Sequence, residues 1–191
     1  WDGRNADGIT IEKIFLPYRR EKTELYQRAE KLAGQNKIEV YYIEKGQKVT
    51  EKEMKIVCLA PERKNLSGEE NSDSMVLSVK YGDFTALLTG DLEGNGEKIL
   101  VDSGILKAID FLKVAHHGSE FSTTEEFLRQ TKPELAVISC AEKNRYGHPH
   151  EALLSRLKKA GTVIKMTKES GAVKVITDGK KYTVKEKRRD I

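Results

Sequence analysis

Short apolar segments of strand length recur along this chain, and helical segments separate several of them. Apolar residues that alternate with polar ones, or that form runs of a few residues, indicate strands. This pattern predicts strands at residues 9–16, 38–43, 54–60, 74–81, 84–89, 111–115, 135–140, 162–166, 172–177 and 182–185. Helical spacing predicts helices at residues 21–33, after Asp91, at 125–130 and at 150–160. Strands that partly alternate with helices and partly form hairpins predict an α/β fold, with a mixed sheet covered by helices.

Turn and cap residues support these boundaries. Gly82-Asp83 lies between two predicted strands and is typical of a tight hairpin, and Asp178-Gly179 is expected to turn the last pair of strands. Thr123 or Thr124 is expected to cap the helix at 125–130.

The length and the composition predict one domain. The chain has 191 residues, of which 38% are hydrophobic, and this is enough for one core. We expect a single domain over residues 1–191, with residues 1–8 irregular and residues 186–191 forming a basic tail. No apolar run is long enough to cross a bilayer and no signal-peptide pattern is visible, so this chain is expected to be soluble. Cys58 and Cys140 lie in apolar runs and are expected to be buried free thiols.

The net charge of +4 favours anionic partners only mildly. Much of the excess lies near the C-terminus, in Lys180-Lys181 and residues 185–189. One interpretation of this basic segment is a solvated chain end. The other is contact with a phosphate backbone, which would make binding sensitive to salt.

All four histidines lie in two short segments, and each segment follows a predicted buried strand. His116 and His117 follow the strand at 111–115, and His148 and His150 follow the strand at 135–140. Asp91 has the same position after the strand at 84–89. Because scaffolds present reactive groups on loops at strand ends, these loops are candidates for a functional site.

The chemistry of these side chains points to metal ions. Imidazole and carboxylate groups bind Zn²⁺, and together they also suit Mn²⁺. A carboxylate such as that of Asp91 can bridge two cations, and a bound cation generates hydroxide near neutral pH. Adjacent residues after a strand do not point the same way. We therefore expect one of His116 and His117 to be a ligand and the other to be structural, and we favour His116 as the ligand.

Four segments carry a more specific resemblance, namely LLTGD (87–91), LKVAHHGS (112–119), AVIS (136–139) and NRYGHPH (144–150). Together they resemble the metallo-β-lactamase-like domain of ComEC-type competence proteins, over about residues 74–177 and more loosely back to Ile9. The resemblance implies a metallo-β-lactamase-type αββα sandwich. It also implies a hydrolase that uses two divalent cations, Mn²⁺ or Zn²⁺.

The resemblance assigns roles to individual residues. Asp91 matches the bridging aspartate of the family, and the catalytic candidates are Asp91, His116, His117 and His148. Of these, the expected metal ligands are Asp91, His116 and His148. The candidates for substrate contact are Ser119, Asn144, Arg145 and His150. A guanidinium suits phosphate, but Asn144 and Arg145 fit an ordinary surface loop equally well.

The chain also departs from the family pattern. The first metal motif, His-x-His-x-Asp-His, has no counterpart, because no histidine precedes His116. The segment at 70–74 offers Asn71, Ser72 and Asp73 but no histidine. We therefore expect a truncated chain, with a sandwich that is incomplete at its N-terminus. These 191 residues are expected to bind metal weakly or not at all, and to have little or no activity.

Three functional hypotheses follow. The first is a phosphodiesterase or nuclease that acts on single-stranded DNA during uptake, in a parent protein whose channel portion lies in the bacterial cell membrane. The second is a non-catalytic module that binds nucleic acid or a partner. The third is a stand-alone hydrolase of small phosphoesters or acyl compounds. Salt-dependent binding of single-stranded DNA would favour the nucleic-acid hypotheses over the third.

Overall fold

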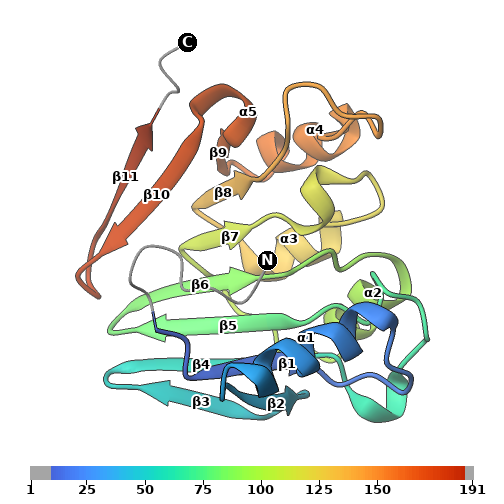
Figure 1. Ribbon diagram of the computed structural model, residues 1–191. Helices are drawn as coiled ribbons and strands as arrows, with labels where there is room; N and C mark the ends of the chain where they lie inside the picture. The colour runs from blue at the N-terminus through green and yellow to red at the C-terminus, as the bar shows by residue number, and fades with distance from the viewer. Residues whose placement is uncertain (1–9, 188–191) are drawn as a thin grey trace.

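A computed structural model describes residues 10–187 of the chain (Figure 1). Its strands are β1 (Lys13–Pro17), β2 (Glu39–Ile43), β3 (Lys48–Glu51), β4 (Met54–Ala60), β5 (Val76–Tyr81), β6 (Phe84–Leu88), β7 (Phe111–Lys113), β8 (Leu135–Ile138), β9 (Val163–Met166), β10 (Ala172–Thr177) and β11 (Tyr182–Lys187). Its α-helices are α1 (Glu24–Gln35), α2 (Gly94–Asp102), α3 (Glu125–Thr131), α4 (Glu151–Lys159) and α5 (Thr167–Ser170), and 3-10 turns are η2 (Arg63–Asn65) and η3 (Ala115–Gly118).

The largest sheet has seven strands in the order β3-β4-β5-β6-β7-β8-β9. Neighbouring strands are antiparallel from β3 to β6 and parallel from β6 to β9. The predicted mixed sheet is therefore confirmed. Because β6, β7 and β8 run in the same direction, the loops that follow them emerge at one edge of the sheet.

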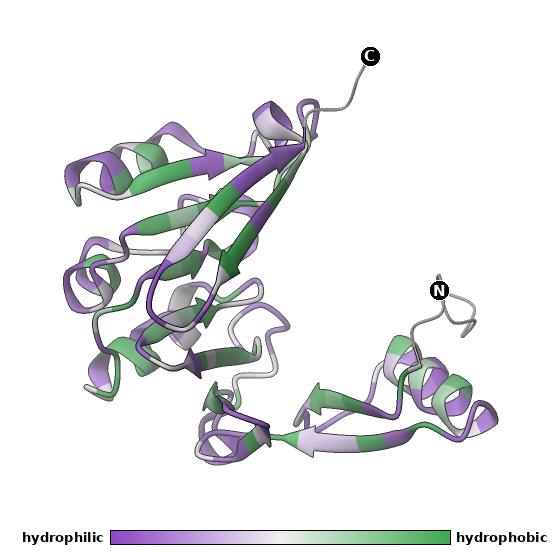
Figure 2. Cartoon of the chain, turned by 90° about the vertical axis from the view of Figure 1, so that its left-hand side faces the viewer, coloured by the Kyte–Doolittle hydropathy of each residue, from purple (hydrophilic) through white to green (hydrophobic). Residues whose placement is uncertain are grey.

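The core lies between this sheet and three helices. Figure 2 shows α2, α3 and α4 on one side of the sheet. Alternate residues of the central strands point to this side, so that Leu112, Ala136 and Ile138 are fully buried. Leu100 of α2, Phe127 of α3 and Leu153 of α4 are at most 2% exposed and cover them. This burial fixes the direction of each strand end and hence the position of each loop.

The other side of the sheet is more open. Its cross-strand pairs include Leu77 with Leu88 and Val79 with Ala86, and Leu88 is 36% exposed. The β10–β11 hairpin contacts the turn between β5 and β6, where the backbone nitrogen of Asp83 donates to the carbonyl of Gly179 at 2.6 Å. The unit formed by β1, α1 and β2 projects away from this side (Figure 2).

Most predicted elements are present, and the differences lie mainly at their ends. The strand predicted at 111–115 ends at Lys113, and the one predicted at 135–140 ends at Ile138, because the chain leaves the sheet in turns there. β11 extends to Lys187, so the first two residues of the predicted tail belong to a strand. The predictions for residues 1–8 and 188–191 lie outside the described residues. The sequence pattern missed β3 and α5, which are only four residues long.

The predicted turns, helix cap and free thiols are also found, and the one correction concerns the burial of Cys140. Thr124, rather than Thr123, is the N-cap of α3, and its hydroxyl accepts from the backbone nitrogen of Phe127 at 3.3 Å. Both cysteines are free, and Cys58 is buried, but Cys140 is only half-buried because it lies in the turn after β8. In the described part of the chain, no helix combines the length and apolar character needed to span a membrane.

Candidate metal site

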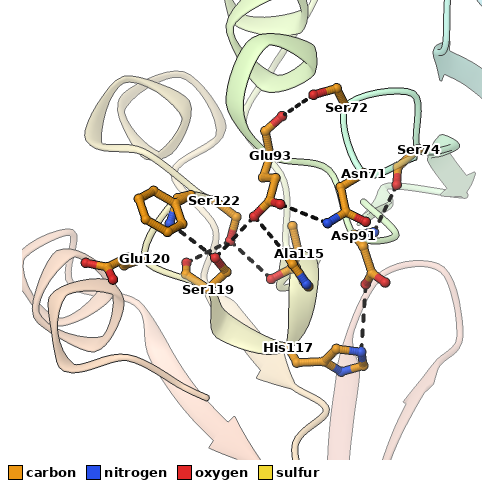
Figure 3. Close-up of polar contacts among 12 residues, drawn as sticks. Asn71, Ser72, Ser74, Asp91, Glu93, Ala115, His117, Ser119, Glu120 and Ser122 are labelled. Atoms are coloured by element: carbon orange, nitrogen blue, oxygen red, sulfur yellow. Dashed lines mark hydrogen bonds and ion pairs between the residues drawn. The ribbon is translucent and has the colours of Figure 1, made fainter. Parts of the chain in front are cut away.

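The loops after β6, β7 and β8 bring the predicted site residues together. Ring centroids lie 5.2 Å apart for His116 and His148, and 4.9 Å apart for His148 and His150. The rings of His116 and His117 are 6.3 Å apart. Four histidines from two separate sequence segments thus form one cluster, and Asp91 lies at its edge beside His117 (Figure 3).

Asp91 faces His117 and not His116. Oδ1 of Asp91 lies 3.9 Å from Nε2 of His117, and the two side chains are 45% and 50% exposed. Nδ1 of His117 is 2.6 Å from the carbonyl oxygen of Ser139, which fixes the ring. The backbone nitrogen of Asp91 donates to Oγ of Ser74 at 3.3 Å, as Figure 3 shows. Ser139 thus holds the ring of His117, Ser74 holds the backbone of Asp91, and both side chains remain accessible to solvent.

The two adjacent histidines point to different partners because of their backbone. His116 has φ 44° and ψ 48°, and His117 has φ 53° and ψ 18°, so both are left-handed. Residues with a Cβ rarely adopt this region, which costs them about 1–2 kcal/mol each. The turn directs His116 towards Glu93, at 2.7 Å between Nδ1 and Oε2, and directs His117 towards Asp91.

Glu93 is a part of the site that the sequence analysis missed. Its carboxylate contacts Nδ1 of His116. It also accepts from Asn71 and from Ser119 (Figure 3). Burial by itself would raise the pKa of Glu93, but the hydrogen bonds from Asn71, His116 and Ser119 outweigh it and lower that pKa. The available signal was the position of Glu93, two residues after Asp91 in the same loop.

Ser119 and Asn144, two predicted substrate contacts, are engaged in holding the loops. Ser119 is 2% exposed, and its hydroxyl donates to Oε2 of Glu93 at 3.2 Å. The side chain of Asn144 closes its own loop, because Oδ1 accepts from the backbone nitrogen of His148 and Nδ2 donates to the carbonyl of the same residue.

The other two predicted contacts are more accessible. Arg145 is exposed and stacks over the ring of Tyr146, with its guanidinium carbon 4.7 Å from the centroid. His150 is half-buried, and its Nδ1 accepts from the backbone nitrogen of Glu120 at 3.0 Å. Arg145 also donates to the hydroxyl of Tyr146, so its guanidinium is exposed to solvent but already paired with that side chain.

Burial changes the ionisation of two further groups near the cluster. It lowers the pKa of His148, and the neighbouring rings of His116 and His150 lower it further. It also lowers the pKa of Lys113 at the end of β7, although the charge of Asp91 opposes this shift. Lys113 was also missed, and the signal was a single charge in the apolar strand FLKVA.

The donor types suit a divalent cation, but the arrangement is incomplete. Within residues 10–187, no three side chains of the His, Cys, Asp or Glu type converge closely enough to hold a metal ion. Oδ1 of Asp91 and Nε2 of His117, which lie 3.9 Å apart, provide two possible metal ligands. A structural zinc site has four ligands, and a catalytic one usually has three from the protein. The described residues therefore provide a partial set of ligands.

Comparisons with known proteins relate part of this chain to a family and to named relatives. Residues 63–142 match the family model of the metallo-beta-lactamase superfamily. The chain is 34% identical over 141 residues to ComE operon protein 3 of Bacillus subtilis, which is 74% of this chain and 18% of that protein. The resemblance to the metallo-β-lactamase domain of ComEC-type competence proteins is thereby confirmed.

Two further relatives extend the comparison. The chain is 40% identical over 106 residues to Recombination protein 2 of Haemophilus influenzae, and 40% identical over 114 residues to Competence protein ComA of Neisseria gonorrhoeae. These matches cover 56% and 59% of this chain, but only 13% and 16% of the relatives. The matched part of this chain thus corresponds to less than a fifth of the length of each relative.

Proposed function

We propose that this chain is part of a metal-dependent phosphodiesterase that cleaves DNA during its uptake by bacteria. The observation that best supports the proposal is the cluster of Asp91 and four histidines at one edge of the sheet. The relatives include one protein named for competence and one named for recombination, which favours DNA as the substrate.

The cofactors, the substrate and the location of the parent protein are proposed from the resemblance to ComEC-type competence proteins. The cofactors are two divalent cations, Mn²⁺ or Zn²⁺, and the substrate is a single strand of DNA. The parent protein lies in the bacterial cell membrane, and its channel portion is the covalent partner of this domain. When bound, the cations supply an activated water for attack on a phosphodiester.

The residues of this chain have distinct parts in the proposal. Asp91 and His117 are the pair of side chains best placed to hold a cation. The exposed guanidinium of Arg145, which now contacts Tyr146, would pair with a phosphate. Because the described residues provide an incomplete set of ligands, these 191 residues alone are expected to bind metal weakly and to turn over slowly.

The same incomplete set favours a second candidate function. A module that binds single-stranded DNA without cleaving it needs basic and aromatic groups but no metal. Arg145 and the 59% exposed Tyr146 provide one of each beside the histidine cluster.

One experiment separates these functions. The chain and its Asp91→Asn variant are incubated with a fluorescent single-stranded oligonucleotide and Mn²⁺, and both binding and cleavage are followed at low and at physiological salt. Slow cleavage that depends on Mn²⁺ and disappears in Asp91→Asn supports the phosphodiesterase. Salt-dependent binding without cleavage supports the binding module.

Two other results would contradict parts of the proposal. Robust cleavage by the wild-type chain would contradict the expected weak activity. Hydrolysis of bis(p-nitrophenyl) phosphate without any binding of DNA would instead support a hydrolase of small phosphoesters.

A further inference from the structure

Glu93 connects its own loop with two neighbouring segments of the site. Oε2 lies 2.7 Å from Nδ1 of His116 and accepts from Oγ of Ser119 at 3.2 Å. Oε1 accepts from Nδ2 of Asn71 at 2.8 Å. The side chain is 21% exposed, so these contacts are partly shielded from water. Figure 3 shows the carboxylate between Asn71 and Ser119.

The hydrogen-bond network assigns the tautomer of His116. An ionised carboxylate can only accept hydrogen bonds, and Asn71 and Ser119 already donate to this one. Nδ1 of His116 is therefore the donor. In a neutral ring with its hydrogen on Nδ1, the lone pair lies on Nε2.

Contacts outside the loop of His116 keep the two groups together. The backbone of His116 is left-handed, at φ 44°, and its nitrogen donates to the carbonyl of Gly90 at 3.2 Å. The carbonyl of Glu93 accepts from Oγ of Ser72 at 3.3 Å. The backbones that carry the two side chains are thus held in place by contacts with Gly90 and Ser72.

We propose that Glu93 is a positioning residue, which holds the imidazole of His116 so that Nε2 and not Nδ1 is presented to the ligand of the site. His117 has a parallel arrangement, with a backbone carbonyl in place of the carboxylate. Metal-binding histidines usually donate their other ring hydrogen to such an acceptor. The role towards a metal rests on the proposed function, whereas the control of the ring does not.

The test measures the histidine tautomers directly. Long-range ¹H–¹⁵N NMR spectra are recorded for the metal-free wild-type chain, Glu93→Gln, Glu93→Asp and Glu70→Gln, at a pH where the imidazoles are neutral. Glu70 is a matched control, because it is an exposed carboxylate and lines, together with Glu93, a cavity of about 490 Å³. Within the described residues its side chain makes no hydrogen bond to a histidine.

The expected result is a predominantly Nδ1–H form of His116 in the wild type and in Glu70→Gln. Glu93→Gln should give a mixture of tautomers, and Glu93→Asp, which keeps the carboxylate, should retain more of the Nδ1–H form. In a Zn²⁺ titration followed by the same spectra, Glu93→Gln should raise the half-saturating concentration about 10- to 100-fold.

Other outcomes would decide against the proposal. An Nε2–H form in the wild type, or an unchanged Nδ1–H form in Glu93→Gln, would overturn it. If Glu93→Gln alters the tautomer but neither this variant nor the wild-type chain responds to Zn²⁺, control of the ring by Glu93 is supported, and the role of Glu93 towards a metal is contradicted for this chain.

Discussion

Substituting Gly118 by alanine tests the contact that joins the two histidine loops. A Cβ at Gly118 would lie 2.5 Å from Cβ of Pro149 and 3.0 Å from Cδ2 of Leu153. Real Cβ atoms do not approach that closely, so the loop after β8 or the start of α4 must move. Gly118 also has φ 91°, a conformation that favours glycine.

The expected loss of stability has two parts. The left-handed backbone costs an alanine about 1–2 kcal/mol. The clash with a well-packed side chain adds about 1–3 kcal/mol. Gly118→Ala should therefore lower the free energy of unfolding by about 2–5 kcal/mol, which is a large share of the stability of an ordinary domain.

Gly46→Ala is a matched control for the first part. Gly46 has φ 90°, nearly the same as Gly118, but a Cβ there meets nothing within 4 Å. Only the backbone cost of about 1–2 kcal/mol should remain. Urea unfolding of the three proteins, compared at equal m-values, measures the difference. If the two variants lose the same stability, the proposed close approach of the two loops is refuted.

Two further predictions concern α3 and the loop before it. Thr124→Ala should lower the free energy of unfolding by about 1 kcal/mol, because the hydroxyl caps α3. Thr23→Ala should lower it little, because the Thr23 side chain makes no capping bond at α1. Equal losses of stability in urea unfolding would contradict this prediction. Glu97 is 2% exposed and accepts from the backbone nitrogens of Thr123 and Thr124, and burial raises its pKa. A raised folded-state pKa gives stability that is present below the unfolded pKa and is lost as the pH rises through the folded pKa. Glu97→Gln should therefore destabilise the protein less at pH about 7 than at pH about 4, where an unfolded glutamate titrates, and a larger loss at neutral pH would show that the pKa is lowered instead.

Local signals in the sequence were sufficient to predict most elements and the edge of the sheet where the site lies. Short apolar segments specified nearly all the strands, and Gly82-Asp83 specified a hairpin, because both signals are local. Asp91 and the histidines follow buried strands directly. Once those strands pair in parallel, their loops must meet, and this could be expected from the residues alone.

The pairing of the side chains within the site, in contrast, depends on how the loops pack in three dimensions. The left-handed turn at His116 and His117 places His117 beside Asp91 and sends His116 to Glu93, and the local sequence contains no periodic signal for this turn. Asn144 resembled a substrate contact but closes its own loop. Hydrogen bonds and close approaches between distant segments depend on atomic distances that a pattern of residue types does not specify. The pattern therefore located the site, and the packing of the loops assigned the partners within it.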